Sequence, residues 1–407
     1  MKTSAHNTQH LNEWGILLVL AGIQFTHIMD FMIMMPLGPQ LMRILHLSPQ
    51  EFSFLVSAYT FSASIAGFCA SFYIDRFDRK QALLSLYFGF ILATLCCALA
   101  KDYHFLLIAR VLAGAFGGVA GATIFSIIGD VIPEERRGKA TGFVMSAFSV
   151  SAVAGIPIGL SLATHFTWNA PFLMLTGVST LIVIGAWIAL PAIRGHLETQ
   201  ITEKTSVKTH LKVIICNRLH LKLFFFISML MLAGFSIIPF ISPYMVANVG
   251  LSEKDLPYLY LFGGLTTFFT SNLIGRLVDR YGKFKVFVGV SLSSILPIVI
   301  LTNLPHSSLI IAVMTMVCFM SLVSGRIVPA MTIITSSIDP KYRGSFMSFN
   351  SSIQQMASGS AALIAGIMIG RSETGALTHY NLVGMLSVIA TFICIYLVLN
   401  IQKRHSN

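Results

Sequence analysis

Charge is scarce in this 407-residue sequence, because only 11% of its residues are Asp, Glu, Lys or Arg. Soluble proteins carry about 25% charged residues. Hydrophobic residues make up 55% of the chain, so its polar residues cannot cover the surface of a folded molecule, and lipid must be its main solvent. The composition therefore excludes an ordinary soluble protein and predicts an all-α protein that crosses a membrane many times.

The sequence also lacks the patterns that mark most enzymes and metalloproteins. It has no glycine-rich nucleotide loop, no metal-ligand spacing and no grouping of a nucleophile with a base. We therefore expect no catalysis, no cofactor and no metal, and an energy source that is a gradient rather than ATP. The six cysteines are Cys69, Cys96, Cys97, Cys216, Cys318 and Cys394. They form no CxxC pair, and five of the six lie in apolar runs, where free cysteines behave as small buried hydrophobic residues.

The first apolar run, 14–35, is too long for the core of a signal peptide. It also contains Gln24, His27 and Asp30, and no small-residue cleavage site follows it. We interpret it as a retained membrane helix.

Twelve apolar runs have the length of about 20 residues that a membrane-spanning helix needs. A polar segment of mixed charge separates the first six runs from the last six. This arrangement predicts an N-terminal six-helix bundle over 1–191, a linker over 192–220 and a C-terminal six-helix bundle over 221–407. The predicted spans are 14–35, 52–74, 81–100, 104–130, 139–162, 169–191, 221–247, 257–278, 284–303, 308–336, 344–370 and 378–401.

Lys and Arg are distributed unevenly between the two ends of these spans. With the N-terminus inside, 21 of the 27 fall in cytoplasmic segments, and Arg110 and Arg326 fall within spans. Because cytoplasmic loops are enriched in Lys and Arg, we predict that both termini lie in the cytoplasm and that the membrane is the bacterial inner membrane. The same distribution explains the net charge of +11 without nucleic acid as a partner. The residues on the opposite side are Arg43, Lys101, Lys254 and Arg371.

Two charged loops recur at equivalent places in the two halves of the chain. Asp75-Arg76-Phe77-Asp78-Arg79-Lys80 follows the second span, and Asp279-Arg280-Tyr281-Gly282-Lys283 follows the eighth. The segments 133–138 and 340–344, which both begin with proline and end with Arg-Gly, follow spans four and ten. This recurrence implies a duplicated six-helix unit, and transporters built from two such halves bind their substrate at the interface between them.

Three of these motifs resemble those of the major facilitator superfamily. The first charged loop resembles motif A, although Ser71 and Asp78 stand where that motif usually has glycine, and the second-half copy keeps Gly275 and Gly282. Motif B is matched by Arg110 with Gly114, Gly117 and Gly118, and the antiporter motif C by Gly155-Ile156-Pro157-Ile158-Gly159. The resemblance is greatest to bacterial drug:proton antiporters and arabinose-efflux-type permeases. It implies twelve helices in two pseudo-symmetric bundles.

The resemblance also implies a role for the charged loops. Asp75, Arg76 and Arg79, with Asp130 at the end of the fourth span, are expected to form a cytoplasmic cluster that latches the outward-facing state. Simple anchoring by positive residues explains Arg76 equally well but does not explain Asp75. By the same resemblance, the gating residues of the second half are Asp279, Arg280 and Lys283.

Asp30 is the only carboxylate well inside a predicted span, and such residues usually face a cavity or a charged partner. It lies about 25 Å from the cytoplasmic edge and Arg110 about 30 Å, at 1.5 Å per residue, so the two share a depth. Burial disfavours an ionised carboxylate, whereas a nearby guanidinium favours it. We predict that Asp30 carries the coupling proton under the control of Arg110; a static ion pair is the alternative.

Other polar residues within the spans are candidates for proton relay or for the substrate cavity. His27 lies three residues before Asp30 on the same helix face and either relays protons or packs as a hydrogen-bonded core histidine; Gln24 extends its stripe. Arg326 has no evident acidic partner and favours an anionic or zwitterionic substrate; the alternative is that it bonds to backbone carbonyls or snorkels to the membrane surface. Tyr244, Asn350 and Gln354 lie on polar stripes that either line a wet cavity or bond neighbouring helices.

The glycines and proline of the fifth span, Gly155, Pro157 and Gly159, predict a helix that packs closely and kinks. Packing alone also explains them, but their match to the antiporter motif favours a function. The leading hypothesis is a monomeric, proton-coupled exporter of a small molecule that works by alternating access in the lipid bilayer. A facilitator or importer of a small, possibly anionic, metabolite is the alternative, and a non-transporting receptor is a third.

Overall fold

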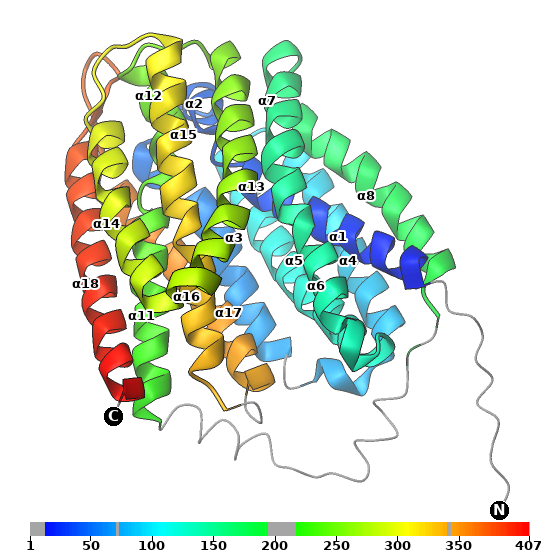
Figure 1. The fold of residues 1–407 in the computed structure, drawn as a ribbon. Coiled ribbons are helices and arrows are strands. Elements are labelled where there is room, and N and C mark those ends of the chain that lie inside the picture. The colour runs from blue at the N-terminus through cyan, green and yellow to red at the C-terminus, as the bar shows by residue number, and fades with distance from the viewer. Residues whose placement is uncertain (1–12, 71–72, 192, 194–216, 340–342, 407) are drawn as a thin grey trace, which may run out of the picture.

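A computed structural model describes residues 13–70, 73–191, 193, 217–339 and 343–406. It contains twelve helical passes, as predicted, and the helices run side by side in one bundle (Figure 1). The passes before residue 192 are α1 (Glu13–Ile33), α3 (Pro49–Ala70), α4 (Arg79–Leu99), α5 (Tyr103–Val131), α6 with α7 (Glu134–Val150 and Ile156–His165) and α8 (Ala170–Ala189). Those after it are α11 with α12 (Arg218–Phe235 and Ile241–Ala247), α13 (Leu256–Tyr281), α14 (Lys283–Thr302), α15 with α16 (Leu309–Gly325 and Ile327–Ser336), α17 (Arg343–Met368) and α18 (Tyr380–Ser406).

The bundle has two ends, which we name by what they carry. The start of α1 and the end of α18 define the terminal side, and the opposite end is the far side (Figure 1). The far side also carries α2 (Gly38–Ile44) and a two-residue antiparallel pairing of β1 (Gly370–Arg371) with β2 (Leu377–Thr378). Neither α2 nor this hairpin was predicted, because both are shorter than any periodicity in the sequence can reveal.

Among the described residues, ten passes are both long and apolar enough to cross a membrane. The other two, α13 and α17, have 26 residues each, about 39 Å at 1.5 Å per residue, but contain more polar side chains. Large apolar side chains such as Leu181, Trp187 and Ile188 are about 70% exposed on the outer surface, as expected where lipid is the solvent.

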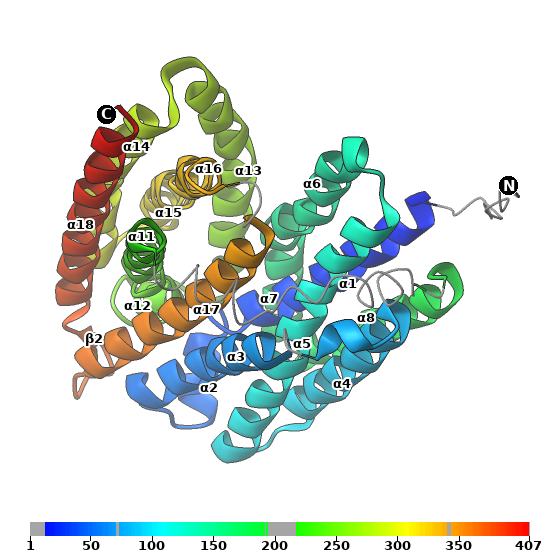
Figure 2. The same ribbon diagram turned by 90° about the horizontal axis from the view of Figure 1, so that it is seen from below.

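The helices before and after residue 192 form two groups that meet along α3 and α17 (Figure 2). Ser64 of α3 donates a hydrogen bond to the carbonyl of Ser352 on α17, and Phe68 packs edge-on against Phe349 with ring centroids 5.7 Å apart. The division into two bundles joined by 192–220 stays a prediction, because most of the linker lies outside the described residues.

Helix boundaries differ from the predicted spans where capping chemistry extends them. The second pass was predicted over 52–74 but runs over Pro49–Ala70, because Ser48 and Glu51 form a reciprocal pair of hydrogen bonds at its start. After it, Ile74–Arg76 forms a separate 3₁₀ turn. The fifth pass begins at Glu134 rather than 139, with Pro133 before it and two glutamates in its first turn.

Three passes that were predicted as continuous helices are interrupted. A π-helical turn, η2 (Ser151–Gly155), joins α6 to α7; a 3₁₀ turn, η3 (Ile238–Phe240), precedes α12; and Arg326 separates α15 from α16. Pro157 and Pro239 lie within or next to two of these breaks, because proline removes a backbone donor and displaces the preceding turn. A kink in the fifth pass was predicted from Pro157; the break at Arg326 was not.

Candidate functional site

Asp30 and Arg110 form an ion pair in the interior of the first group. Arg110 Nη1 lies 2.8 Å from Asp30 Oδ2 and 3.2 Å from the Asp30 carbonyl oxygen, and both side chains are fully buried. Asp30 lies near the end of α1, and α5 runs antiparallel to it, so the two residues share a depth as the sequence predicted. The folded protein is strongly destabilised when one partner of a buried pair of this kind is removed or neutralised, because the other charge is left unpaired.

Two further residues hold the pair in place, and the sequence did not reveal either. The Arg110 guanidinium lies over the ring of Tyr59 on α3, 4.4 Å from its centroid, in a cation–π contact. Thr94 on α4 donates a hydrogen bond to Asp30 Oδ1 over 3.4 Å. Nothing in a tyrosine of α3 or a threonine of α4 marks it for this role before the rotation of each helix is known.

The side chains of His27 and Gln24 also lie on α1 but form no hydrogen bond with Asp30 or Arg110. Both ring nitrogens of His27 and the Oε1 atom of Gln24 are buried without a hydrogen-bond partner. The His27 ring packs against α5 at Gly117 and Gly121. The motif-B glycine Gly117 therefore makes room for an imidazole rather than for a second helix.

The candidate cavity residues of the second group lie in different places. Arg326, at the α15–α16 break, is 1% exposed and donates to Thr391 Oγ1 of α18 over 2.9 Å. Asn350 is fully buried with both side-chain amide atoms unpaired, and Gln354 lies 3.9 Å from the sulfur of Met331. Tyr244 lies apart from these residues: its hydroxyl donates to the Leu304 carbonyl, and its ring packs on Tyr380 on the far side.

The motif-A loop forms part of the predicted cluster on the terminal side. Arg79 Nε lies 3.0 Å from Asp130 Oδ2, joining the start of α4 to the end of α5. Asp78 caps α4 by accepting from the backbone amide of Lys80, which gives a physical reason for an aspartate where motif A usually has glycine. Arg76 is exposed, and the side chain of Asp75 lies outside the described set.

The second-half loop is chemically different from the first. Lys283 occupies the place equivalent to Arg79 in the repeated loop, and its Nζ donates to Ser336 Oγ at the end of α16. Arg280 lies over the ring of its neighbour Tyr281, 5.2 Å from the centroid, and Asp279 is exposed. Lys283, at the start of α14, thus donates to a neutral hydroxyl, whereas Arg79, at the start of α4, forms an ion pair with a carboxylate.

The antiporter-like motif packs directly on the helix that carries Asp30. A methyl group added to Gly155 would lie 3.0 Å from the sulfur of Met29, and one added to Gly159 would lie 2.8 Å from Cδ1 of Ile33. These glycines therefore allow α7 and the η2 turn to approach α1 on both sides of Asp30. A change in the angle of the fifth pass would press on α1 at the level of the ion pair.

This arrangement, twelve passes with a buried ion pair between the first and fourth, agrees with a sequence-profile match. The profile described as "Major Facilitator Superfamily" matches residues 20–362 and 223–406. The chain belongs to the Major Facilitator Superfamily. It is therefore a multi-pass membrane protein of a transport family.

Individual relatives of this superfamily member are distant. It is 24% identical over 332 residues to the "Uncharacterized MFS-type transporter YbcL" of Bacillus subtilis (strain 168), covering 81% of each chain. It is 25% identical over 238 residues to a "Probable sugar efflux transporter" of Helicobacter pylori (strain P12), covering 58% of this chain and 59% of that one. A crystal structure of a D-xylose-proton symporter has the same fold, with a TM-score of 0.75, 15% identity, and coverage of 94% of this chain and 97% of that one.

On the far side of the superfamily fold, the two groups are joined by an ion pair that the sequence did not predict. Both terminal nitrogens of Arg43 on α2 contact the carboxylate of Glu253, at 2.9 and 3.0 Å. A methyl group on Gly38 would lie only 2.8 Å from Pro243 of α12. Since 210 residues separate Arg43 from Glu253, no sequence spacing could have suggested the pair.

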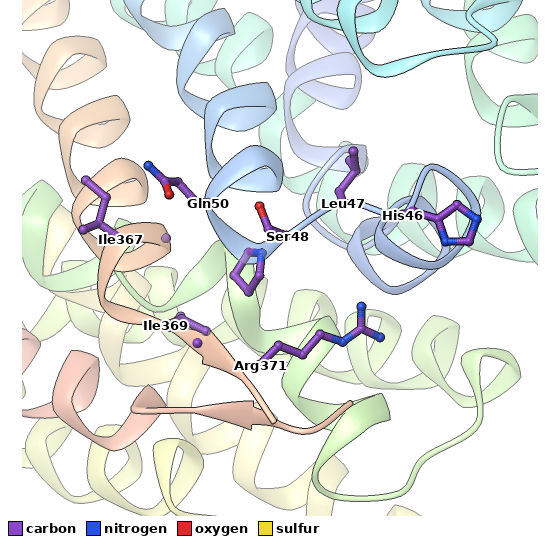
Figure 3. Close-up of a pocket in the computed structure, with 10 residues that line it drawn as sticks. His46, Leu47, Ser48, Gln50, Ile367, Ile369 and Arg371 are labelled. Atoms are coloured by element: carbon purple, nitrogen blue, oxygen red, sulfur yellow. The ribbon is translucent and has the colours of Figure 1, made fainter. Parts of the chain in front are cut away.

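Two pockets lie beside this junction and not at the predicted cavity residues. One, about 440 Å³, is lined by residues that include His46 and Ser48 from the α2–α3 turn, Gln50 from the first turn of α3 and Arg371 from β1 (Figure 3). The other, about 710 Å³, includes Arg43 and Glu253. Gln24, Arg326, Tyr244, Asn350 and Gln354 line neither pocket.

Proposed function

We propose that this protein is a proton-coupled exporter of a small molecule and that Asp30 carries the coupled proton. The Asp30–Arg110 ion pair is the observation that supports this most directly, because both partners are fully buried at 2.8 Å. A deeply placed ionisable residue with a named partner is a functional candidate in a membrane protein. Protonation of Asp30 removes one of the two charges and so weakens the contact that ties α1 to α5.

The surroundings of Arg110 allow this contact to be broken without isolating the guanidinium. Arg110 retains the Asp30 carbonyl oxygen and the face of Tyr59 as partners when the carboxylate is neutral. Both are weaker partners than a carboxylate, so protonation shifts the balance between two arrangements of α1 and α5. A difference in interaction energy between two states is what a coupled ion must supply.

Export and alternating access have separate support. The relative named "Probable sugar efflux transporter" supports outward transport, and the antiporter-like motif packs on α1 beside Asp30. The interrupted passes at η2, η3 and Arg326 provide points at which helices can bend. We further propose that the terminal side faces the cytoplasm, that Arg79 and Asp130 latch it, and that His27 is the secondary candidate for proton relay.

A transport assay with Asp30 variants tests the proposal. Inside-out vesicles that contain the protein are screened with labelled sugars, carboxylates, zwitterions and hydrophobic cations, with and without an imposed pH gradient. We expect Asp30→Asn to abolish the gradient-driven component, because the side chain can no longer release a proton, while Asp30→Glu retains part of it. If Asp30→Asn still concentrates a compound against its gradient when a pH gradient is imposed, Asp30 is not the coupling residue.

A further inference from the structure

Arg326 is a buried cation that the proton-coupling proposal does not use. Its side chain is 1% exposed at the break between α15 and α16. No carboxylate among the described residues forms an ion pair with it, in contrast to Arg110, which has Asp30. A charge in the membrane interior is costly unless it is compensated, so the second group holds a positive charge that needs a partner.

The neutral groups around Arg326 satisfy only part of its hydrogen-bonding capacity. Nη1 donates to Thr391 Oγ1 over 2.9 Å, and Nε donates to the Val323 carbonyl over a long 3.4 Å. The Thr391 hydroxyl donates its hydrogen bond to the Ser387 carbonyl, so its oxygen can only accept from Arg326. A guanidinium carries five N–H donors, and within the described part of the chain Nη2 donates to nothing.

Asn350 supplies a second buried polar group without a partner in the same group of helices. Its side chain is fully buried, and neither its Oδ1 nor its Nδ2 has a hydrogen bond. It follows Phe346 by one helical turn, and Arg326 precedes Ala330 by one turn; Phe346 and Ala330 belong to one apolar cluster. Counted from the terminal-side ends of their helices, Arg326 is about 15 Å deep and Asn350 about 10 Å deep.

An anionic group is the chemistry that these two residues lack. A carboxylate accepts two parallel hydrogen bonds from a guanidinium and cancels its charge, and an amide nitrogen can donate to the same group. A neutral sugar hydroxyl or a water would fill the hydrogen bonds but leave the charge uncompensated. A second cation would add to the charge.

We propose that Arg326 binds a monovalent anionic group of the transported compound in the second group of helices, where Asn350 is a further buried amide without a partner. The compound is thus an anion or a zwitterion with a carboxylate or a similar head group. The assignment to cargo rests on the proposed transport function; anion binding itself does not depend on proton coupling. A free inorganic anion such as chloride has the same charge, and the experiment separates the two sources.

Thermal unfolding of the purified protein in lipid nanodiscs, at one pH and without a gradient, tests the site. Sodium benzoate, sodium acetate and sodium chloride are titrated separately into the unaltered protein and into three variants. Arg326→Met removes the charge at similar length, Arg326→Lys keeps it, and Thr391→Val removes the hydroxyl that accepts from Nη1 while leaving the guanidinium. General salt effects act on all four proteins alike, so the differences between them report the site.

We expect a carboxylate to raise the unfolding temperature of the unaltered protein. Arg326→Met should weaken the apparent affinity for the carboxylate at least about tenfold, or about 1.4 kcal/mol. Arg326→Lys and Thr391→Val should retain most of this affinity. Stabilisation by chloride alone would overturn the assignment to cargo. Equal stabilisation of the Met variant, or no stabilisation of the unaltered protein by any of the salts, would overturn the anion site. If Thr391→Val loses the effect as fully as Arg326→Met, Arg326 is a structural link to α18. Should Arg326→Met fail to fold, Arg326→Gln replaces it, with the same expected loss.

Neither result depends on the pH gradient used to test Asp30. Loss of the carboxylate effect in Arg326→Met with normal gradient-driven transport in Asp30→Asn would reject proton coupling through Asp30 and keep the anion site. The reverse pattern would reject the anion site alone.

Discussion

The imidazole of His27 lies in the space that Gly117 leaves on the surface of α5. A methyl group at Gly117 would lie 2.6 Å from His27 Cδ2 and 2.9 Å from the hydroxyl of Tyr59. One turn further along, a methyl group at Gly121 would meet the same ring at an ordinary contact distance of 3.5 Å. These two glycines of α5, which face the same imidazole, therefore provide a matched pair of test positions.

We predict that Gly117→Ala displaces His27 and Tyr59 and costs about 1–3 kcal/mol, as overpacking of a filled core does. Gly117→Ala should also impair transport as strongly as His27→Ala does, because it displaces the same imidazole and also moves Tyr59, whose ring packs on Arg110. Gly121→Ala is the control and should leave both properties nearly unchanged. The measurements are the unfolding temperature and transport in vesicles. Equal behaviour of Gly117→Ala and Gly121→Ala would show that the contact of Gly117 with His27 does not matter.

Depth could be predicted from the sequence, whereas rotation about the helix axis could not. Counting residues from the cytoplasmic ends of the predicted spans placed Asp30 and Arg110 at one level, since an α-helix rises by a fixed 1.5 Å per residue. Which neighbour each side chain faces depends on how the helices pack, so the contacts of Arg110 with Tyr59 and of Asp30 with Thr94 were missed. The pairing of Arg43 with Glu253 was missed for the same reason, because it depends on how α2 meets the loop before α13.

The ion pair of Arg79 with Asp130 is predicted to matter more for turnover than its counterpart in the second group. Asp130→Asn removes the charge that faces a guanidinium side chain only 8% exposed, whereas Ser336→Ala removes a neutral acceptor from Lys283. We therefore expect Asp130→Asn to slow transport several-fold with little change in substrate binding, and Ser336→Ala to have a smaller effect. Binding and transport must be measured separately; unchanged rates in Asp130→Asn would leave the loop as a simple anchor.

The Arg43–Glu253 pair is predicted to control the opening of the far side rather than stability. The Arg43 side chain is 64% exposed, and exposed pairs contribute only about 0–1 kcal/mol. Arg43→Glu places two negative charges together and should alter the transport rate at low salt, with little change in the unfolding temperature. The exchange of both residues, Arg43→Glu with Glu253→Arg, should restore the rate. Failure of the exchange to restore a rate lost in Arg43→Glu would show that the pairing itself is not what matters.

Orientation in the membrane is predicted from the distribution of Lys and Arg and can be tested at two exposed loops. In a background without native cysteines, Lys254→Cys on the far side should react with a membrane-impermeant maleimide in intact cells. Arg280→Cys on the terminal side should react only after the membrane is opened. Lys254 lies two residues before α13 and Arg280 lies in its last turn, so the pair reports opposite ends of one helix. Labelling of Arg280→Cys in intact cells would reverse the proposed topology.

Removing both charges of the Asp30–Arg110 pair together should distinguish the contribution of the pair to stability from its contribution to proton coupling. Asp30→Leu alone leaves Arg110 as an unpaired charge in a site with no exposure, and the loss of one partner from a buried pair typically costs about 3–5 kcal/mol. The double variant Asp30→Leu with Arg110→Met replaces the pair by apolar groups of similar size, and such replacements are often neutral. We therefore expect the double variant to unfold at a higher temperature than Asp30→Leu, yet to remain inactive in gradient-driven transport, because no group is left to carry the proton. A double variant that recovers transport along with stability would show that the pair is structural, and His27 would then be the remaining candidate on α1.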